Sequence, residues 1–187
     1  SVLDKEGNRV AATLSINYPF GASFVVPGTG VLLNNEMDDF SASPLAPNAY
    51  GLVGNHANSI QPGKRPLSSM TPTFLESNDR IGIIGTPGGS RIISMVLISS
   101  LEFVDGKLPV AWVKKERFHH QYMPDILQFE KDAFSPSLQQ ELERRGHELK
   151  EVDRKYGNMH AILWDKSRGK VYAASDPRGE GLADLQK

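Results

Sequence analysis

The chain has 187 residues, with 21 basic and 22 acidic side chains, a net charge of −1 and no cysteine. The lack of cysteine excludes disulfides, thiolate metal sites and a cysteine nucleophile. The near-neutral charge gives no reason to expect nucleic acid or an anionic membrane as a partner, and no apolar run is long enough to span a bilayer. We predict a single domain of mixed strands and helices over residues 1–187.

The first forty residues alternate between apolar runs and turn residues. Residues 2–3 and 10–16 are predicted to be two strands, separated by a glycine-containing turn at 4–8. Two further short strands or edges are expected at 23–26 and 30–33, around a Pro-Gly turn.

Residues 41–63 show little apolar periodicity and contain prolines, glycines and asparagines. A loop of this length within a compact domain is typically a lid, a binding loop or disordered. Because Tyr50, Leu52 and Val53 give the segment apolar surface to pack, we predict a lid.

The second half of the chain has clearer periodicity. A strand at 80–85, a glycine-rich turn at 86–90 and an apolar helix at 91–103 are followed by a short helix at 108–115 and a strand at 126–130. Ser135 and Pro136 indicate the N-terminus of another helix, which Gly146 ends. Residues 160–164 and 170–174 are predicted to form a hairpin.

The acidic stretch after the apolar residues 31–33 is the first candidate site. Asn34, Asn35, Glu36, Asp38 and Asp39 follow one another within six positions. Buried carboxylates must be paired or solvated, so this cluster suits a bound cationic group. A solvated acidic turn is the alternative for the cluster taken alone.

Gly88 and Gly89 form the second candidate site, between a predicted strand and the N-terminus of a predicted helix. Backbone amides at such a position can stabilise a developing negative charge. The alternative is a tight turn that requires glycine dihedrals, and both explanations can hold together.

Ser68 and Ser69 form the third candidate site, close to Lys64 and Arg65. Paired hydroxyls near cations suit a carboxylate, whereas no Gly-x-Ser-x-Gly motif supports a serine nucleophile. With Asn17, Glu36 and Asp39 as an ammonium site and Gly88 and Gly89 as an oxyanion site, the three sites fit an α-amino acid whose side-chain acyl group is attacked.

Other chemistries have little support. The five histidines have no i, i+4 pair typical of a helical zinc site, and we interpret His119 and His120 as structural. Gly85 to Ser90 lacks the ending of a phosphate loop, which argues against a nucleotide site.

Five motifs occur in order along the chain and carry a resemblance to a known family. They are Gly-x-Leu-Leu-Asn-Asn-x-Met-Asp-Asp-Phe-Ser at 30–41, Lys-Arg-Pro-Leu-Ser-Ser-Met at 64–70, Gly-Gly-Ser-Arg-Ile at 88–92, Arg-Phe-His-His-Gln at 117–121 and Ala-Ser-Asp-Pro-Arg at 174–178. Over nearly its whole length the chain resembles the small, C-terminal subunit of bacterial γ-glutamyltransferases (γ-glutamyl transpeptidases).

The resemblance implies an α+β fold, the four-layer αββα sandwich of N-terminal-nucleophile hydrolases. The family's precursor cleaves itself, and the small subunit stays bound to a large subunit that would complete this sandwich. The implied activity is cleavage of the γ-glutamyl bond of glutathione or related compounds, with transfer to water or to an amino acid or peptide. The resemblance implies no cofactor or metal, and a periplasmic or secreted location.

The resemblance also implies roles for individual residues. Asn17, Glu36 and Asp39 would hold the α-amino group, and Ser68 and Ser69 the α-carboxylate. Gly88 and Gly89 would form the oxyanion hole, Ser15 would support the nucleophile, and Tyr50 would close the pocket from the lid.

Three positions depart from the family pattern. The family's small subunit begins Thr-Thr-His-x-Ser, with its first threonine as the nucleophile. This chain begins at the serine, so the nucleophile is expected four residues upstream of Ser1. Glu36 replaces a glutamine found in many bacterial members, and Ser15 replaces a threonine.

Two alternative functions remain at this point. One is an acylase of the same superfamily that acts on glutaryl-β-lactam side chains, which have no α-amine for Glu36 and Asp39 to hold. The other is a catalytically inactive binding subunit, suggested by the missing threonine.

Overall fold

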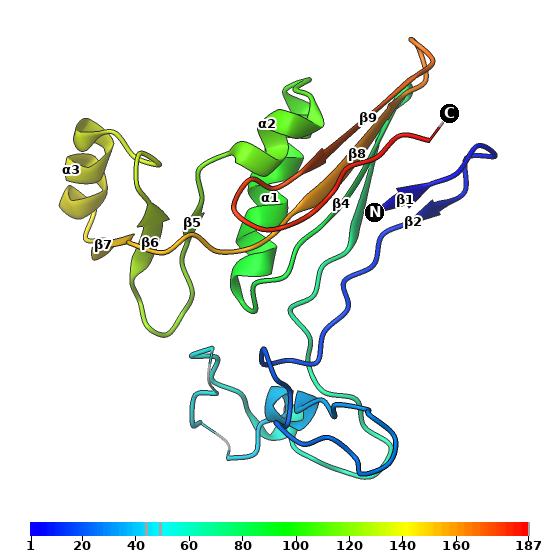
Figure 1. Cartoon of the computed structure of the whole chain (residues 1–187). Helices are drawn as coiled ribbons and strands as arrows, with labels where there is room; N and C mark the ends of the chain where they lie inside the picture. The colour runs from blue at the N-terminus through cyan, green and yellow to red at the C-terminus, as the bar shows by residue number, and fades with distance from the viewer. Residues whose placement is uncertain (44, 49, 187) are drawn as a thin grey trace. The chain divides into compact units, whose positions relative to one another are not determined.

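The computed structural model describes residues 1–43, 45–48 and 50–186. The chain divides into two compact units (Figure 1). Ser1–Thr13 and Met70–Lys187 form one, which we call the sheet unit, and Leu14–Ser69 form the other, which we call the loop unit. The single domain expected from the sequence stays a prediction.

A four-stranded antiparallel sheet is the centre of the sheet unit. Its strands are β3 (Thr73–Glu76), β4 (Arg80–Gly85), β8 (His160–Asp165) and β9 (Lys170–Ser175), in the order β3-β4-β8-β9. The β8–β9 hairpin pairs Ile162 with Ala173. The run Ile81 to Ile84 is buried throughout, as expected for a central strand covered on both faces.

Helices α1 (Arg91–Val104) and α2 (Pro109–Lys114) cover one face of this sheet (Figure 1). The side chains buried between these helices and the sheet form one apolar cluster: Ile84, Ile92, Met95, Val96, Phe103, Trp112, Val113, Met159, Ala161 and Leu163. The Trp112 indole packs edge-on against Phe103, with ring centroids 5.6 Å apart, and donates a hydrogen bond to the Lys107 carbonyl. Burial of each large apolar side chain contributes about 1.5–3 kcal/mol to folding.

A small hairpin made of β1 (Val2–Leu3) and β2 (Arg9–Val10) packs against the main sheet. The Ser1 hydroxyl lies 3.2 Å from the Ile83 carbonyl oxygen and 3.1 Å from that of His160. Ser1 therefore lies against the two central strands β4 and β8.

The second sheet of this unit has three strands, β5 (Phe118–His119), β6 (Leu127–Glu130) and β7 (Leu149–Val152). β6 and β7 are parallel and are connected through helix α3 (Pro136–Arg144). The Ser135 side chain caps α3 by accepting a hydrogen bond from the Leu138 amide at 3.3 Å.

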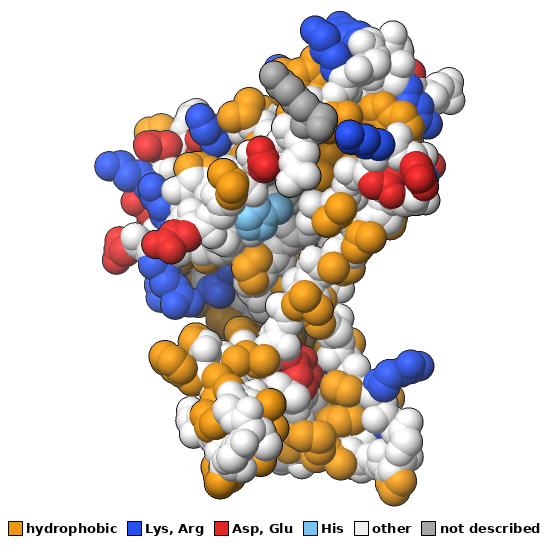
Figure 2. Space-filling view, turned by 45° about the vertical axis from the view of Figure 1, so that its right-hand side comes forward, with side chains coloured by type: hydrophobic (Ala, Val, Ile, Leu, Met, Phe, Trp, Pro, Cys, Tyr) orange, Lys and Arg blue, Asp and Glu red, His pale blue; other side chains and the backbone are white. Residues whose placement is uncertain are grey.

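The loop unit has almost no regular structure among its described residues. It contains two short 3₁₀ helices, η1 (Glu36–Asp39) and η2 (His56–Asn58), and two isolated bridges, Val25–Leu32 and Pro47–Val53. Many of its apolar side chains are exposed, including Leu14 at 92%, and Figure 2 shows hydrophobic side chains spread over the surface. Among the helices of the described residues, none has the length and apolar character to cross a bilayer.

The structure confirms most of the elements predicted for the second half of the chain. The helices at 91–103 and 108–115, the helix that Ser135 caps, the strands at 80–85 and 126–130 and the hairpin at 160–174 are all present. The apolar composition of 91–103 indicates a largely buried helix, and this expectation was too simple, because Ile93, Leu97 and Leu101 are each more than half exposed.

The strand predictions for the first forty residues were largely wrong. Of the strand expected at 10–16, only Val10 is in a strand, as the last residue of β2. None of the described strands pairs with residues 11–16. The segments at 23–26 and 30–33 share a single bridge. Positive φ angles at Ser23, Gly28 and Gly30 interrupt the extended backbone that a longer ladder needs.

Candidate active site

The turn between β4 and α1 presents two backbone amides without acceptors. Among the described residues, neither the Gly88 nor the Gly89 amide donates a hydrogen bond, although both residues are half-buried. The Ser90 side chain makes no capping bond, so the positive end of the helix dipole remains available. Two available amides at a helix N-terminus are the arrangement that an oxyanion hole needs, and the role of Gly88 and Gly89 in one stays a prediction.

Gly88 needs both the conformation and the small size of glycine. Its φ is +150°, and a Cβ atom at this position would lie 2.6 Å from the Cε of Met95. Real Cβ atoms do not approach other heavy atoms so closely. The tight-turn explanation therefore applies to Gly88, and it leaves the oxyanion explanation open.

A hydrogen bond from the segment that precedes β8 holds the first residue of the turn, Thr86, in place. The buried Thr86 hydroxyl accepts a hydrogen bond from the Asn158 amide at 3.1 Å. The next residue, Met159, donates its amide to Asp176 Oδ2 at 2.9 Å. This connects the turn to a buried cluster of charged residues.

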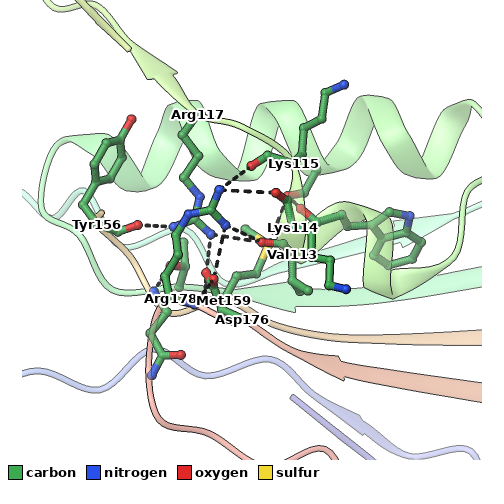
Figure 3. Close-up of polar contacts among 12 residues, drawn as sticks. Val113, Lys114, Lys115, Arg117, Tyr156, Met159, Asp176 and Arg178 are labelled. Atoms are coloured by element: carbon green, nitrogen blue, oxygen red, sulfur yellow. Dashed lines mark hydrogen bonds and ion pairs between the residues drawn. The ribbon is translucent and has the colours of Figure 1, made fainter. Parts of the chain in front are cut away.

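That cluster joins Arg117, Glu130, Asp176 and Arg178 and contains two positive and two negative charges. Figure 3 shows Arg117, Asp176 and Arg178 of this cluster side by side. Arg117 pairs with Asp176, while Arg178 binds both carboxylate oxygens of Glu130, at 2.8 and 2.6 Å. Burial alone would raise the pKa of the Asp176 carboxyl. The Met159 and Arg178 amides and the Arg117 guanidinium nevertheless hold that pKa below its usual value.

The charged cluster also holds the surrounding elements together. The Arg178 guanidinium donates to the carbonyls of Val113 and Lys115, at 2.8 and 3.0 Å, at the end of α2 (Figure 3). Arg117 donates to the Tyr156 carbonyl. Sequence reasoning gave these residues no role, although Arg117, Asp176 and Arg178 belong to two of the quoted motifs.

The loop unit brings the predicted ammonium-binding residues together. Glu36, Asp38 and Asp39 all lie on η1, where side chains three positions apart are eclipsed. Burial raises the pKa of Asp39 to about 6, together with the charges of Glu36 and Asp38 and a side-chain hydrogen bond with Glu36. Within the described residues, no ion pair involves these three carboxylates, so they can accept an external cation.

Asn17 lies beside η1 in a left-handed conformation, with φ +69°. Its side-chain amide donates to the Asn35 carbonyl at 3.1 Å, and its backbone amide donates to the Ser15 hydroxyl at 2.7 Å. Asparagine tolerates this conformation better than most residues. Ser15 therefore supports Asn17 in this structure, and its role beside a nucleophile stays a prediction.

Tyr50, from the segment predicted to be a lid, lies next to the same residues. Its hydroxyl donates to the Asn17 carbonyl at 3.3 Å. Burial raises the pKa of Tyr50, and the charges of Asp39, Glu36 and Asp38 add to this effect. Asn17, Glu36, Asp39 and Tyr50 thus form one constellation within the loop unit. Whether the segment opens and closes stays a prediction.

Ser68 and Ser69 lie at the end of the loop unit, in a segment without regular structure. Ser68 is exposed and Ser69 is half-buried. Their role as carboxylate donors stays a prediction.

The histidines show no sign of a metal site. His119 is buried, with its Nδ1 2.7 Å from the Ser94 hydroxyl and its Nε2 2.8 Å from Gln121 Oε1. Among the described residues, no group of three His, Asp or Glu side chains could hold a metal ion.

A strand, a glycine turn with two available amides and a helix N-terminus are together typical of enzymes that stabilise an oxyanion during acyl transfer. The structure of an acivicin-inhibited gamma-glutamyltranspeptidase matches this chain with a TM-score of 0.89 and 41% identity, covering 96% of this chain and 97% of that one. The cephalosporin acylase from Bacillus halodurans matches with a TM-score of 0.78 and 28% identity, covering 92% of this chain and 31% of that one. The class is that of the N-terminal-nucleophile hydrolases, with the predicted α+β fold.

The family follows from the sequence comparisons. The gamma-glutamyltranspeptidase family model matches residues 1–185, so the chain belongs to that family. The glutathione hydrolase proenzyme of Escherichia coli K12 is 47% identical over 182 residues, which cover 95% of this chain. The match spans only 30% of that proenzyme's length.

Proposed function

We propose that this chain is the small subunit of an enzyme that cleaves the γ-glutamyl amide bond of glutathione and related compounds. The observation that carries the proposal is the pair of available amides at Gly88 and Gly89, in a chain that also holds an uncompensated acidic site. Family membership supports the same chemistry. The acceptor of the γ-glutamyl group is water or the amine of an amino acid or peptide.

In the proposed mechanism, the substrate's α-ammonium group binds Glu36, Asp39 and Asn17, while Ser68 and Ser69 bind its α-carboxylate. The hydroxyl of a threonine four positions before Ser1 attacks the γ-carbonyl carbon. The threonine's own amine takes the hydroxyl proton and passes it to the leaving amine. The oxyanion formed at the γ-carbonyl accepts hydrogen bonds from the Gly88 and Gly89 amides.

The resulting γ-glutamyl ester is then attacked by water or by an acceptor amine, which releases the threonine. Removal of one oxyanion donor typically lowers kcat by about a hundred- to a thousandfold. The geometry of the Gly88–Gly89 turn is therefore central to the proposed rate.

The proposed partner is a large subunit produced from the same precursor by self-cleavage. The 30% coverage of the E. coli proenzyme supports this, because most of the relative's length lies outside the match. The exposed apolar side chains of both units and a groove of about 990 Å³ between residues 1–5, β8, β9 and residues 182–186 offer surface for such a subunit. The proposed location is the periplasm or the exterior of the cell.

The direct test is an assay of the processed heterodimer with γ-glutamyl-p-nitroanilide, with and without a dipeptide acceptor. We expect p-nitroaniline release that the acceptor accelerates, and a γ-glutamyl dipeptide as a second product. No release by a heterodimer shown by mass spectrometry to carry the N-terminal threonine would overturn the proposal and support an inactive binding subunit.

An acylase for glutaryl side chains is the second candidate, because of the likeness to the Bacillus halodurans acylase. Asp39→Ala separates the two candidates. If the natural donor carries an α-amine, the substitution raises KM for γ-glutamyl-p-nitroanilide far more than for glutaryl-p-nitroanilide. Equal effects on the two donors would favour the acylase.

A further inference from the structure

Tyr18 occupies a position between the acidic helix η1 and the segment that carries Tyr50. Its hydroxyl donates a hydrogen bond to Asp38 Oδ2 at 2.8 Å, and its backbone amide donates to Asn35 Oδ1 at 3.1 Å. Asn35 directly precedes η1. Tyr18 thus forms hydrogen bonds both with the residue before η1 and with Asp38, the third residue of η1.

The hydroxyl of Tyr18 remains a hydrogen-bond donor at ordinary pH. The hydrogen bond to Asp38 is the main reason that the pKa of Tyr18 is raised to about 12, and partial burial adds to it. The donor holds the Asp38 side chain in place by a hydrogen bond to one carboxylate oxygen. This carboxylate stands between Glu36 and Asp39 on the crowded helix η1.

The ring of Tyr18 contacts the other side of the same constellation. It packs edge-on against the ring of Tyr50, with centroids 6.1 Å apart and planes at 65°. The Tyr50 hydroxyl returns to the carbonyl of Asn17, the residue before Tyr18. Tyr18 and Tyr50 therefore contact each other, and Tyr50 also contacts Asn17, the neighbour of Tyr18 in the chain. The hydrogen bond from Tyr18 to Asp38 connects this group to η1.

We propose that Tyr18 is a positioning residue for the ammonium site, which holds Asp38 and the Tyr50 ring so that Glu36 and Asp39 face the substrate's α-amine. This inference rests on the proposed function. Tyr18 does not itself bind the substrate but acts through Asp38 and Tyr50. Its loss weakens binding of the donor more than it slows the chemical step.

The test compares Tyr18→Phe, which keeps the ring and removes the hydroxyl, with the unmodified heterodimer in the γ-glutamyl-p-nitroanilide assay. We expect KM for the donor to rise about three- to tenfold, with kcat within about twofold. This is less than the full effect of losing one hydrogen bond to a charged group, because Tyr18 acts on the substrate only through its neighbours. Tyr122→Phe is the matched control, because Tyr122 is 82% exposed and lies in the sheet unit, and it should change neither constant.

A double-mutant cycle with Asp38→Asn shows whether the effect passes through Asp38. In the Asp38→Asn background we expect Tyr18→Phe to change KM by less than about twofold, since the charged partner is already lost. The inference is overturned if Tyr18→Phe leaves KM unchanged, lowers kcat instead, or raises KM equally in both backgrounds.

A wild-type heterodimer without activity would contradict the proposed function and not this inference. In that case, calorimetric titration with L-glutamate replaces the kinetic assay. Weaker binding by Tyr18→Phe than by the wild type would support the positioning role. Equal affinities, or no binding of L-glutamate by either protein, would overturn it.

Discussion

The two units of this chain are held in shape by different forces. The sheet unit has a buried apolar cluster that packs against four paired strands. Each charged residue of its buried cluster pairs with a residue of opposite charge. The loop unit is organised by hydrogen bonds that the Asn17, Tyr18 and Tyr50 side chains donate and the Asn35 side chain accepts. Many of its apolar side chains face solvent. The sheet unit therefore carries the amides proposed for the oxyanion hole, and the loop unit carries the groups proposed for recognition.

The largest expected effect tests the charged cluster of the sheet unit. Asp176→Ala leaves the buried guanidinium of Arg117 without its partner, which typically costs about 3–5 kcal/mol. Urea unfolding of the processed heterodimer should show a much lower midpoint. Because the pKa of Asp176 is held below its usual value, its contribution to stability is lost as the pH falls through that lowered pKa.

The control for this substitution is Glu141→Ala on the exposed surface of α3. Glu141 pairs with Arg144 and Arg145 in solvent, so the midpoint should not move measurably. An Asp176→Ala protein as stable as the Glu141→Ala protein would show that the buried cluster does not hold the sheet unit together.

The next effect concerns the turn between β4 and α1, which contains Gly88 and Gly89. Gly88→Ala places a Cβ against Met95 and should lower kcat about a hundred- to a thousandfold by displacing the oxyanion amides. Gly106→Ala is the control, because Gly106 also has a positive φ, +77°, but its Cβ would meet only Arg80 at 3.9 Å. Gly106→Ala should lower the free energy of unfolding and leave kcat unchanged. A similar kcat for both variants would contradict the role of the turn.

A smaller effect is expected from the titration of Asp39 in the loop unit. With a pKa of about 6, Asp39 loses its charge in acid, and KM for the γ-glutamyl donor should be about tenfold higher at pH 5 than at pH 7.5. Among the described residues, the titratable groups that interact with Asp39 are Glu36, Asp38, Tyr18 and Tyr50. Asp39→Asn should give a high KM with little pH dependence. A wild-type KM that is flat between these pH values would refute the assignment.

The raised pKa of Asp39 also makes the stability of the protein depend on pH. This dependence has the opposite sign to the one expected from the lowered pKa of Asp176. A carboxyl with a raised pKa contributes stability below its ordinary pKa, and this contribution is lost as the pH rises through about 6. Asp39→Asn should therefore narrow the difference in melting temperature between pH 4 and pH 8.

The smallest effect compares one helix cap from each unit. Ser135→Ala removes the cap of α3 and should lower the free energy of unfolding by about 1 kcal/mol. Asn55→Ala removes the cap of η2, where the Asn55 side chain accepts from the Ala57 amide at 2.8 Å. In the loop unit we expect faster local hydrogen exchange and no change in the global midpoint. A global loss from Asn55→Ala would show that the loop unit unfolds together with the sheet unit.

The sequence predicted the sheet unit better than the loop unit for a physical reason. β4 and α1 have long apolar patterns, and Ser135 with Pro136 is a local signal that does not depend on distant contacts. Residues 11–16 have a strand pattern as well, but a strand forms only where a partner lies beside it. Such pairing is a property of the fold that local sequence does not contain.

The candidate site was predicted by its motifs more than by its periodicity. Asn17, Glu36, Asp39 and Tyr50 lie near one another in the loop unit, and their role in binding stays a prediction. Tyr18 was not predicted, because a single tyrosine after an asparagine gives no signal until its hydroxyl is seen beside Asp38. The cluster of Arg117 and Asp176 was also missed, since the two residues are 59 positions apart.

Met95 connects the interior of the sheet unit with the turn that contains Gly88 and Gly89. Its Cε atom fills the space that a Cβ would need at Gly88, and its sulfur atom fills the corresponding space at Gly157. A smaller residue at position 95 would remove the contact at Gly88, but the positive φ of both glycines and the Arg117 guanidinium beside Gly157 would still require glycine there. A bulkier residue at position 95 would press on both loops. Attempts to raise heat resistance by repacking this interior should therefore keep both glycines and conserve the volume of residue 95.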